Sequence, residues 1–425
     1  MADLGCTIAG IESINPYWLA SAPPTDKQYN VERAFACGWG GVVWKTLGEN
    51  PPVVNVSSRY GVHKDTSRGI LGINNIELIS DRPLEVNLRE IEDVRKNYPD
   101  RVIIGSMMAP VEEELWKSLA IKIAGAGVHG IELNLGCPHG MCERGMGSAI
   151  GQVPQMVEDT TRWVREVVGD LPVFTKLTPN TTDILLPAEA ALSGGANAVA
   201  LINTVNSIIG VDLDQMAPNP VLDGKGTHGG YCGSAVKPIA LHMVAEIARN
   251  GATKDLDISA IGGITTWRDA AEFIALGANA LQVCTAAMLY GFRIIEDLND
   301  GLSDFMDAKG YKSIEDFRGR AIPNTVNWND LNMNYDLKAK IEQDKCIECG
   351  RCHIACEDTS HQAITMQANA DGGRDFTVVD AECVGCNLCL HVCPVPDCIT
   401  MVAQENGLPY LTWPEHPKNT QKAAE

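Results

Sequence analysis

The sequence predicts an α/β protein, a (β/α)8 (TIM) barrel followed by a small α+β domain. Two observations support this prediction. Short β-rich runs alternate with helical patterns over roughly the first 300 residues, and eight of the fifteen cysteines lie near the C-terminus in two runs of one spacing. A chain of 425 residues with 45% hydrophobic content is also long enough to bury a large core beside a small second domain.

Eight runs are expected to be strands: Tyr17 to Ala22, Gly41 to Thr46, Val102 to Met108, Gly130 to Leu135, Val173 to Thr178, Ala198 to Asn203, Ile258 to Gly262 and Ala280 to Cys284. Between them we expect helices at Glu85 to Asn97, Glu112 to Ala126, Pro154 to Val168, Pro187 to Leu192, Pro238 to Arg249 and Thr266 to Leu276. Strands that are apolar on both faces are typical of a parallel sheet, and eight such units fit a barrel. A doubly wound sheet is the alternative.

Polar residues and glycines end nearly every predicted strand. These ends are Ala20-Ser21, Lys45-Thr46, Ser106, Asn134, Lys176, Asn203-Thr204, Gly262-Gly263 and Cys284-Thr285. In a barrel of this kind the active site lies where the strands end, and the last two strand ends commonly hold a phosphate. We therefore expect a phosphorylated cofactor on this rim.

The two cysteine runs each have the spacing C-x2-C-x2-C-x3-C, which is typical of a bacterial-type ferredoxin with two [4Fe-4S] clusters. In that arrangement the last cysteine of each run ligates the other cluster. One cluster is expected on Cys346, Cys349, Cys352 and Cys393, and the other on Cys383, Cys386, Cys389 and Cys356. Zinc ribbons and a disulfide scaffold are alternatives that fit this spacing poorly. Cys398 is left over, and we expect it to be buried.

Composition narrows the possible functions and locations. A net charge of -20 argues against nucleic-acid binding, which requires clustered basic residues, although acidity could serve in docking a protein partner. No stretch approaches the length of a membrane span, and the N-terminus lacks the features of a signal peptide. Thiolate ligation of clusters and unpaired cysteines favour a reducing compartment, so we expect a cytoplasmic location.

Iron-sulfur clusters carry one electron at a time, whereas most organic substrates take two, so a flavin is expected between them. The barrel phosphate site favours FMN. The G-x-G-x-x-G match at Gly224 to Gly229 follows a polar, proline-containing stretch and lacks the preceding strand of a dinucleotide fingerprint. We interpret it as a mobile loop near the barrel mouth. The chain is thus expected to depend on a partner for a nicotinamide cofactor.

The loop after the fourth strand, Asn134 to Gly147, contains a candidate proton donor. Its four glycines allow it to close over a site, and Cys137 lies near its start. A thiol whose pKa is tuned toward neutrality can protonate one carbon while a flavin delivers hydride to the next. We therefore predict that Cys137 is the general acid. A buried structural cysteine is the alternative, and Cys142 in the same loop is expected to be incidental.

The chain resembles the catalytic half of dihydropyrimidine dehydrogenase, as found in the bacterial two-subunit form. The motifs that carry the resemblance are Ala20 to Thr25, Trp44-Lys45-Thr46, Asn75 to Ser80, Asn134 to Gly147, Lys176 to Asn180, Ile202 to Val205 and the ferredoxin tail. The resemblance implies reversible reduction of the 5,6 double bond of uracil or thymine, the first step of reductive pyrimidine breakdown. It also implies an FAD- and NAD(H)-binding partner subunit, and hence a hetero-oligomer.

Carried over by position, the resemblance makes Cys137 the proton donor to C5. It assigns the pyrimidine to Asn75, Asn134, Asn203 and Thr204, and FMN to Ala20, Ser21, Lys45, Thr46, Lys176, Gly263, Cys284 and Thr285. Asparagine offers a donor and an acceptor, which suits the ring's amide edges. Lysine near a flavin can stabilise negative charge on the reduced ring. Gly136 departs from the family, which often has serine there, so a hydroxyl contact to substrate is expected to be missing.

The expected domains are a catalytic barrel over residues 1–312, a linker over 313–335, the ferredoxin-like domain over 336–412 and a flexible tail over 413–425. Three other functions stay open at this point: a dihydroorotate dehydrogenase, a Schiff-base lyase acting through Lys176, and a pure electron carrier.

Overall fold

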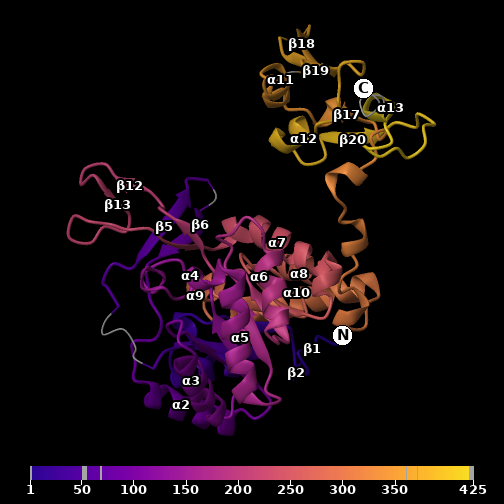
Figure 1. Cartoon of the computed structure of the whole chain (residues 1–425). Helices are drawn as coiled ribbons and strands as arrows, with labels where there is room; N and C mark the ends of the chain where they lie inside the picture. Colours follow the sequence, from indigo (N-terminus) through magenta and orange to yellow (C-terminus); the bar gives the residue numbers. More distant parts are fainter. Residues whose placement is uncertain (1, 50–54, 68, 360, 371, 421–425) are drawn as a thin grey trace. The chain divides into compact units, whose positions relative to one another are not determined.

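Eight parallel strands form a closed barrel in the computed structural model, which describes residues 2–49, 55–67, 69–359, 361–370 and 372–420 (Figure 1). They are β3 (Tyr17–Leu19), β4 (Gly41–Leu47), β7 (Val102–Met107), β8 (Gly130–Asn134), β9 (Val173–Lys176), β10 (Ala198–Leu201), β15 (Asp257–Ile261) and β16 (Ala280–Val283). Each coincides with a predicted strand. The predicted (β/α)8 barrel is confirmed, and the doubly wound alternative is excluded because β16 pairs with β3 and closes the sheet.

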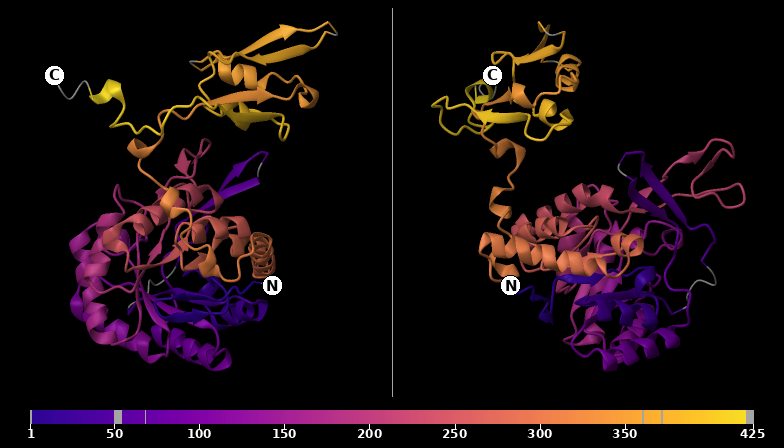
Figure 2. Two further views of the ribbon diagram at one scale, coloured as in Figure 1. Left: turned by 90° about the vertical axis from the view of Figure 1, so that its right-hand side faces the viewer. Right: turned by 180° about the vertical axis from the view of Figure 1, so that it is seen from behind.

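Helices surround the strands (Figure 2). The longer ones are α1 (Gln28–Cys37), α2 (Leu84–Asn97), α3 (Glu113–Gly125), α5 (Pro154–Val168), α6 (Leu185–Ser193), α7 (Lys237–Arg249), α8 (Trp267–Ala275) and α10 (Ile294–Lys309), with the short α4 (Ser148–Gly151) and α9 (Thr285–Tyr290) between them. All six predicted helices are present. The sequence analysis missed α1 and α10, whose buried apolar residues are interrupted by charged and polar ones.

The barrel interior is apolar at the end where the strands begin. Trp18, Val43, Ile104 and Phe174 form one buried cluster there, joined by Ile8 and Ile11. The last two belong to a hairpin that the sequence analysis did not predict, β1 (Cys6–Ile8) paired with β2 (Ile11–Ser13). Because apolar side chains fill this end, the polar strand ends are left at the other.

A second, antiparallel sheet lies beside the barrel mouth and was not predicted. Its order is β11 (Val205–Ser207), β14 (Gly229–Cys232), β6 (Gly69–Asn75) and β5 (Tyr60–Asp65). The pairing of β6 with β14 joins segments far apart in the chain, with Asn75 opposite Gly230. A short pair, β12 (Val211–Asp212) and β13 (Ala217–Pro218), extends from it.

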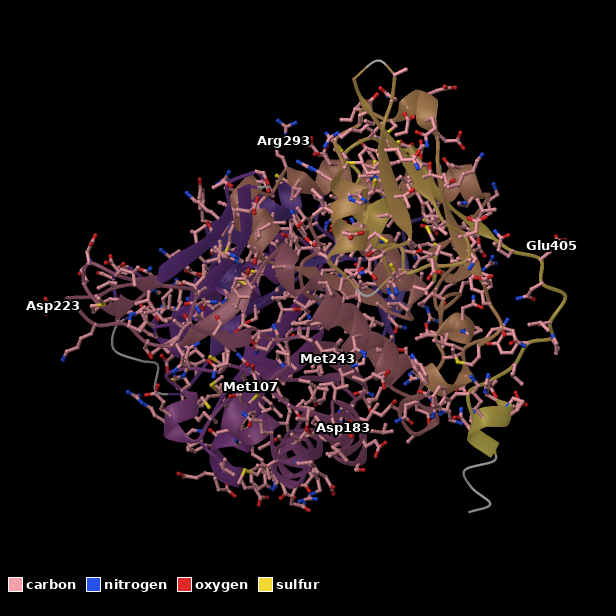
Figure 3. The ribbon with its side chains drawn as sticks, turned by 90° about the horizontal axis from the view of Figure 1, so that it is seen from above. Met107, Asp183, Asp223, Met243, Arg293 and Glu405 are labelled. Carbon is pink, nitrogen blue, oxygen red and sulfur yellow. The ribbon has the colours of Figure 1, made fainter. Side chains whose placement is uncertain are left out.

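The Gly224 to Gly229 segment connects β13 to β14, and no helix opens within it. Its glycine spacing is therefore not a dinucleotide fingerprint. Gly229 begins a strand of the antiparallel sheet, whereas Asp223 projects outward at the periphery of the barrel unit (Figure 3). Only one end of the predicted loop thus lies near the mouth.

The chain divides into two compact units, one ending at Thr325 and the next beginning at Val326. This boundary falls later than the predicted residue 312 because Ile314 and Phe317 are buried in the barrel core. Backbone bonds support the same assignment, since the amide of Gly319 donates to Ile274 at 2.9 Å.

The second unit has two similar halves. In one, β17 (Leu337–Ile341) pairs with β20 (Ile399–Ala403), and in the other β18 (Ile364–Ala368) pairs with β19 (Arg374–Val378). The helices α11 (Arg351–Glu357) and α12 (Leu388–Val392) carry parts of the two cysteine runs. Pro417–Thr420 form the short helix α13, whereas residues 421–425 lie outside the described residues, so the flexibility predicted for 413–425 stays a prediction. None of the described helices combines the length and apolar character required to cross a membrane.

Candidate functional site

A cavity opens at the barrel mouth, where the eight strands end. All thirteen barrel residues predicted from the sequence line it: Ala20, Ser21, Lys45, Thr46, Asn75, Asn134, Cys137, Lys176, Asn203, Thr204, Gly263, Cys284 and Thr285. The antiparallel sheet adds two tyrosines, Tyr60 and Tyr231. The structure thus brings the predicted residues together, while their individual roles stay predictions.

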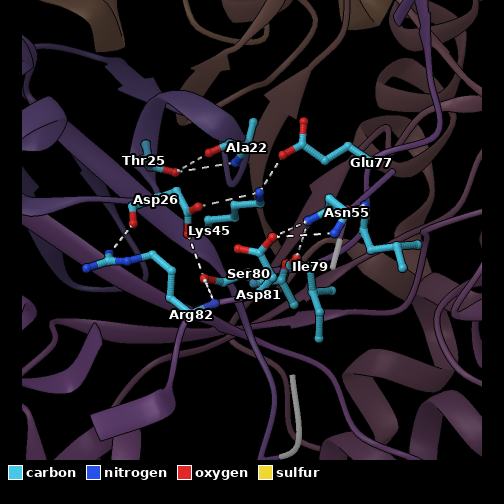
Figure 4. A network of polar contacts seen from close by, with 12 residues as sticks. Ala22, Thr25, Asp26, Lys45, Asn55, Glu77, Ile79, Ser80, Asp81 and Arg82 are labelled. Atoms are coloured by element: carbon cyan, nitrogen blue, oxygen red, sulfur yellow. Dashed lines mark hydrogen bonds and ion pairs between the residues drawn. The ribbon is translucent and has the colours of Figure 1, made fainter. Parts of the chain in front are cut away.

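A buried charge network surrounds Lys45 at one side of the cavity (Figure 4). Its Nζ lies 2.6 Å from Oε1 of Glu77 and 3.6 Å from Oδ2 of Asp26. Glu77 also accepts a hydrogen bond from the Tyr60 hydroxyl and faces Arg59 at 3.5 Å. Glu77 entered the sequence analysis only within a resemblance motif. The sequence did offer a signal for Glu77, because it is a charged residue between the apolar Ile76 and Leu78.

An amide network connects two of the predicted substrate ligands. The Asn203 Nδ2 donates to Oδ1 of Asn134 at 2.9 Å, and the Nδ2 of Asn134 donates to the Thr46 hydroxyl at 2.9 Å. The amide oxygen of Asn203 accepts from the Thr204 backbone N–H at 2.8 Å. Since both amide oxygens are occupied, each asparagine has an N–H donor to spare, which suits carbonyl oxygens of a ligand.

The absence of a side chain at Gly136 has a steric reason. A Cβ at this position would lie 2.5 Å from the Cβ of Asn203 and 2.7 Å from its Nδ2. A serine there therefore requires a different placement of Asn203. Gly136 therefore leaves room for Asn203 in the amide network.

Gly136→Ala should raise the KM for the pyrimidine by roughly tenfold, because displacing Asn203 disturbs one or two hydrogen bonds of about 1 kcal/mol each. Steady-state kinetics should show a smaller change in kcat. Gly145→Ala is the matched control, since Gly145 lies in the same loop and a Cβ there meets nothing within 4 Å, although its positive φ makes alanine mildly strained. An unchanged KM in Gly136→Ala would contradict the steric role.

Cys137 lines the cavity, and its thiol donates to the backbone oxygen of His139 at 3.6 Å. Burial raises the pKa of this thiol to about 11, outweighing the opposing effects of its hydrogen bond and Lys176. The expectation of a near-neutral pKa is therefore corrected. A thiol with this pKa stays protonated at physiological pH, so it can donate a proton but is a poor nucleophile.

The rate of Cys137 alkylation by iodoacetamide should accordingly rise about tenfold per pH unit from pH 7 to 10, because the thiolate fraction grows that steeply below the pKa. Mass spectrometry of the Cys137 peptide measures the rate. A plateau near pH 8 would show that the pKa is not raised.

His139 fixes the loop against the network of Lys45 and Glu77. Its Nε2 donates to the backbone oxygen of Glu77 at 3.0 Å, which leaves Nδ1 as an acceptor. That atom is buried without a hydrogen-bond partner among the described residues. Burial lowers the pKa of His139, so the ring is neutral near pH 7.

Lys176 is the last residue of β9 and lines the same cavity, but it faces a carboxylate that does not line it. Its Nζ is 3.6 Å from Oε1 of Glu132, whose other oxygen accepts from Nε2 of Gln282 at 3.1 Å. Gln282 lines the cavity, and its Oε1 is buried without a hydrogen-bond partner among the described residues. The sequence analysis missed Glu132 and Gln282, since each lies inside an apolar strand.

These features fit a flavin. Gly262, Gly263 and Gly233 line the cavity with positive φ angles of 134°, 77° and 106°, an arrangement that brings backbone close to a ligand. A Cβ on Gly263 would lie 2.8 Å from the Lys237 Cβ. Together with two cationic side chains and the partnerless oxygen of Gln282, this lining suits a ring with N–H and carbonyl groups and a phosphate tail.

In the second unit, a smaller cavity contains cysteines from both runs. Cys356 of the first run lines it together with Cys383, Cys386 and Cys389 of the second. At the other end, Cys346 and Cys393 both interact with the buried Cys398. This is the crossed grouping expected for two cubanes. No group of described residues gathers tightly enough to hold a single metal ion, whereas a cubane takes thiolates spread over its corners.

Comparison with known proteins agrees with this architecture. The sequence profile described as dihydroorotate dehydrogenase matches residues 3–306, and that described as a 4Fe-4S dicluster domain matches residues 339–401. The chain is 42% identical over 396 residues to the NAD-dependent dihydropyrimidine dehydrogenase subunit PreA of Escherichia coli (strain K12), covering 92% of this chain and 94% of that protein.

Two further relatives are similar over most of the chain. The chloroplastic dihydropyrimidine dehydrogenase (NADP(+)) of Arabidopsis thaliana is 40% identical over 357 residues, covering 82% of this chain and 83% of that protein. The catalytic subunit of dihydroorotate dehydrogenase B (NAD(+)) of Pyrococcus horikoshii is 37% identical over 314 residues, covering 74% of this chain and 96% of that protein. The chain belongs to the dihydropyrimidine dehydrogenase family, flavin-dependent oxidoreductases that share the dihydroorotate dehydrogenase barrel and carry an iron-sulfur domain.

Proposed function

We propose that this enzyme reduces the 5,6 double bond of uracil or thymine, reversibly, as the first step of reductive pyrimidine breakdown. The observation that carries the proposal is the single cavity in which the protonated Cys137 thiol faces the same space as the Asn134 and Asn203 amides. The reaction consumes two electrons and two protons. One proton comes from the Cys137 Sγ–H and goes to C5.

The amide groups support a pyrimidine as the ligand. Asn134 and Asn203 present N–H donors to ring carbonyls, while Asn75 and Thr204 line the cavity beside them. The Asn75 Nδ2 donates to the backbone oxygen of Gly230 at 3.0 Å, which fixes Asn75 against the antiparallel sheet. These residues would hold the ring flat and orient C5 toward the thiol.

Charge distinguishes this substrate from dihydroorotate, the second candidate. Orotate carries a carboxylate, whose strongest partner in a buried site is a cation that faces no other carboxylate. The two cations that line the cavity, Lys45 and Lys176, each already face a carboxylate. A neutral pyrimidine is therefore favoured.

FMN is the cofactor that we assign to the cavity, where it would supply the hydride to C6. The residues proposed to hold it are Ala20, Ser21, Lys45, Thr46, Lys176, Gly263, Cys284 and Thr285. Burial raises the pKa of Cys284 to about 12, so this thiol is neutral and suits a ligand-binding wall better than a nucleophile.

Electrons are proposed to reach the flavin singly through the two [4Fe-4S] clusters, from a partner subunit that carries FAD and oxidises NADH. Two observations support the partner. The Escherichia coli relative is named as a subunit of an NAD-dependent enzyme, and neither G-x-G-x-x-G segment of this chain, at 125–130 between α3 and β8 or at 224–229 between β13 and β14, has the strand-to-helix context of a dinucleotide site. A cytoplasmic location stays a prediction based on thiolate ligation.

The test is anaerobic turnover by the purified chain with reduced methyl viologen as the electron donor. Uracil or thymine should yield the 5,6-dihydropyrimidine, and the purified protein should show flavin and iron-sulfur absorbance. Conversion of orotate with none of uracil would assign the alternative, a dihydroorotate dehydrogenase. Cluster absorbance without flavin would overturn the proposal and indicate an electron carrier.

A further inference from the structure

Glu132 lies where neither folding nor substrate contact explains a carboxylate. It is fully buried on β8, between Ile131 and Leu133, and it does not line the cavity. Its neighbours across the sheet are Ser106 on β7 and Phe174 on β9. Burying a charged group costs several kcal/mol, and a well-packed apolar residue at such a place is often neutral or stabilising for the fold.

The carboxylate lies among buried polar side chains below the cavity, namely Gln282, Ser259 and Lys176. We call this group the buried polar layer. Oε2 accepts from Gln282 Nε2 at 3.1 Å, and the same Nε2 lies 3.0 Å from the Ser259 hydroxyl. Oε1 makes no hydrogen bond among the described residues, and its nearest cation is Lys176 at 3.6 Å. Glu132 therefore holds two side chains that do line the cavity, while it remains behind them.

We propose that Glu132 is a positioning residue for the flavin, fixing Lys176 and Gln282 toward the cofactor and lowering the reduction potential of the bound ring. This inference rests on the proposed function, because it requires the flavin in the barrel cavity. The established family membership alone assigns no role to this carboxylate.

The direction of the effect follows from charge. A reduced flavin gains negative charge, which the ammonium of Lys176 stabilises and the carboxylate of Glu132 opposes. Replacing the carboxylate by an amide of the same shape leaves the ammonium uncompensated. The reduced form should then be favoured, and the midpoint potential should become more positive.

Glu132→Gln should shift the equilibrium between oxidised and reduced flavin by at least tenfold toward the reduced form, which for two electrons is about 30 mV. A redox titration with reference dyes, followed at the flavin band, measures the shift. The dissociation constant of FMN, from fluorescence quenching on reconstitution, is the second readout. It should rise as well, because Lys176 loses its fixed orientation.

Ser259→Ala is the matched control. It removes a bond to the same Gln282 in the same buried layer without changing charge, so its potential should equal that of the wild type. Gln282→Met is the second variant, in case Glu132→Gln does not fold. It removes the donor that neutralises part of the carboxylate, so the potential should shift in the opposite direction.

The outcomes separate the two hypotheses. A wild-type chain that does not bind FMN would overturn the proposed function. If the wild-type chain binds FMN, the proposed function stands and the variants test Glu132. An unchanged midpoint potential in Glu132→Gln, or in Gln282→Met where Glu132→Gln does not fold, would overturn the role of Glu132 alone. An equal shift in Ser259→Ala would attribute the effect to packing and would overturn it too.

Discussion

Cys137→Ala should lower the turnover number for uracil reduction by about 10²- to 10⁴-fold, the contribution typical of a positioned general acid. The thiol is the proposed proton donor, it lines the same cavity as the Asn134 and Asn203 amides, and water is a poor replacement for a positioned acid. FMN content and the binding of uracil should persist, because the substitution removes the Sγ–H and little else. Anaerobic steady-state kinetics and equilibrium binding on the same preparation measure both.

Cys142→Ala is the matched control for this experiment. Cys142 lies in the same loop, where its sulfur contacts the Ser148 hydroxyl, and it does not line the cavity. Its turnover should stay within about twofold of the wild type. Cys137→Ser should keep a small residual activity, since a hydroxyl is a weaker acid. Full turnover in Cys137→Ala would mean that another group donates the proton.

Cys356→Ala should remove about half of the bound iron and the cluster held by the second cysteine run. The reason is the crossed grouping, in which Cys356 lines a cavity with Cys383, Cys386 and Cys389. Losing one thiolate of four leaves an iron corner open. Iron analysis and the electron paramagnetic resonance spectrum of the reduced protein measure the loss.

Two comparison variants identify which cluster is lost. The Cys356→Ala spectrum should match that of Cys389→Ala and differ from that of Cys352→Ala. Cys398→Ala should keep its full iron content, since Cys398 is a buried neighbour outside both ligand sets. A match with Cys352→Ala would show that each run binds its own cluster without crossing.

The barrel could be predicted because local patterns determine it. Each strand is a short apolar run, nearly all of the predicted runs end in or are followed by a polar residue or glycine, and most helices begin or end at proline, glycine or a charged turn. The closure of the sheet then places residues such as Lys45 and Asn203 around one mouth, although they are far apart in the sequence. The residues of the site could therefore be predicted once the barrel fold had been predicted.

Other features depend on contacts that no local pattern encodes. The sheet of β5, β6, β11 and β14 depends on the pairing of β6 with β14, more than a hundred residues apart in the chain, and its strands are half exposed and rich in glycine. Helix α10 has a glycine and several acidic residues inside it, which obscured its buried face. Glu132 and Glu77 became significant only when the structure showed which lysine each one faces.

The central claim is that electrons pass from the clusters through a flavin to a pyrimidine ring. It is tested most directly by reducing the purified chain anaerobically, removing the reductant and mixing with uracil in a stopped-flow spectrometer. The account predicts that the flavin and iron-sulfur bands reoxidise together while a matching amount of dihydrouracil forms. Bands that stay reduced in the presence of uracil and of thymine would contradict it.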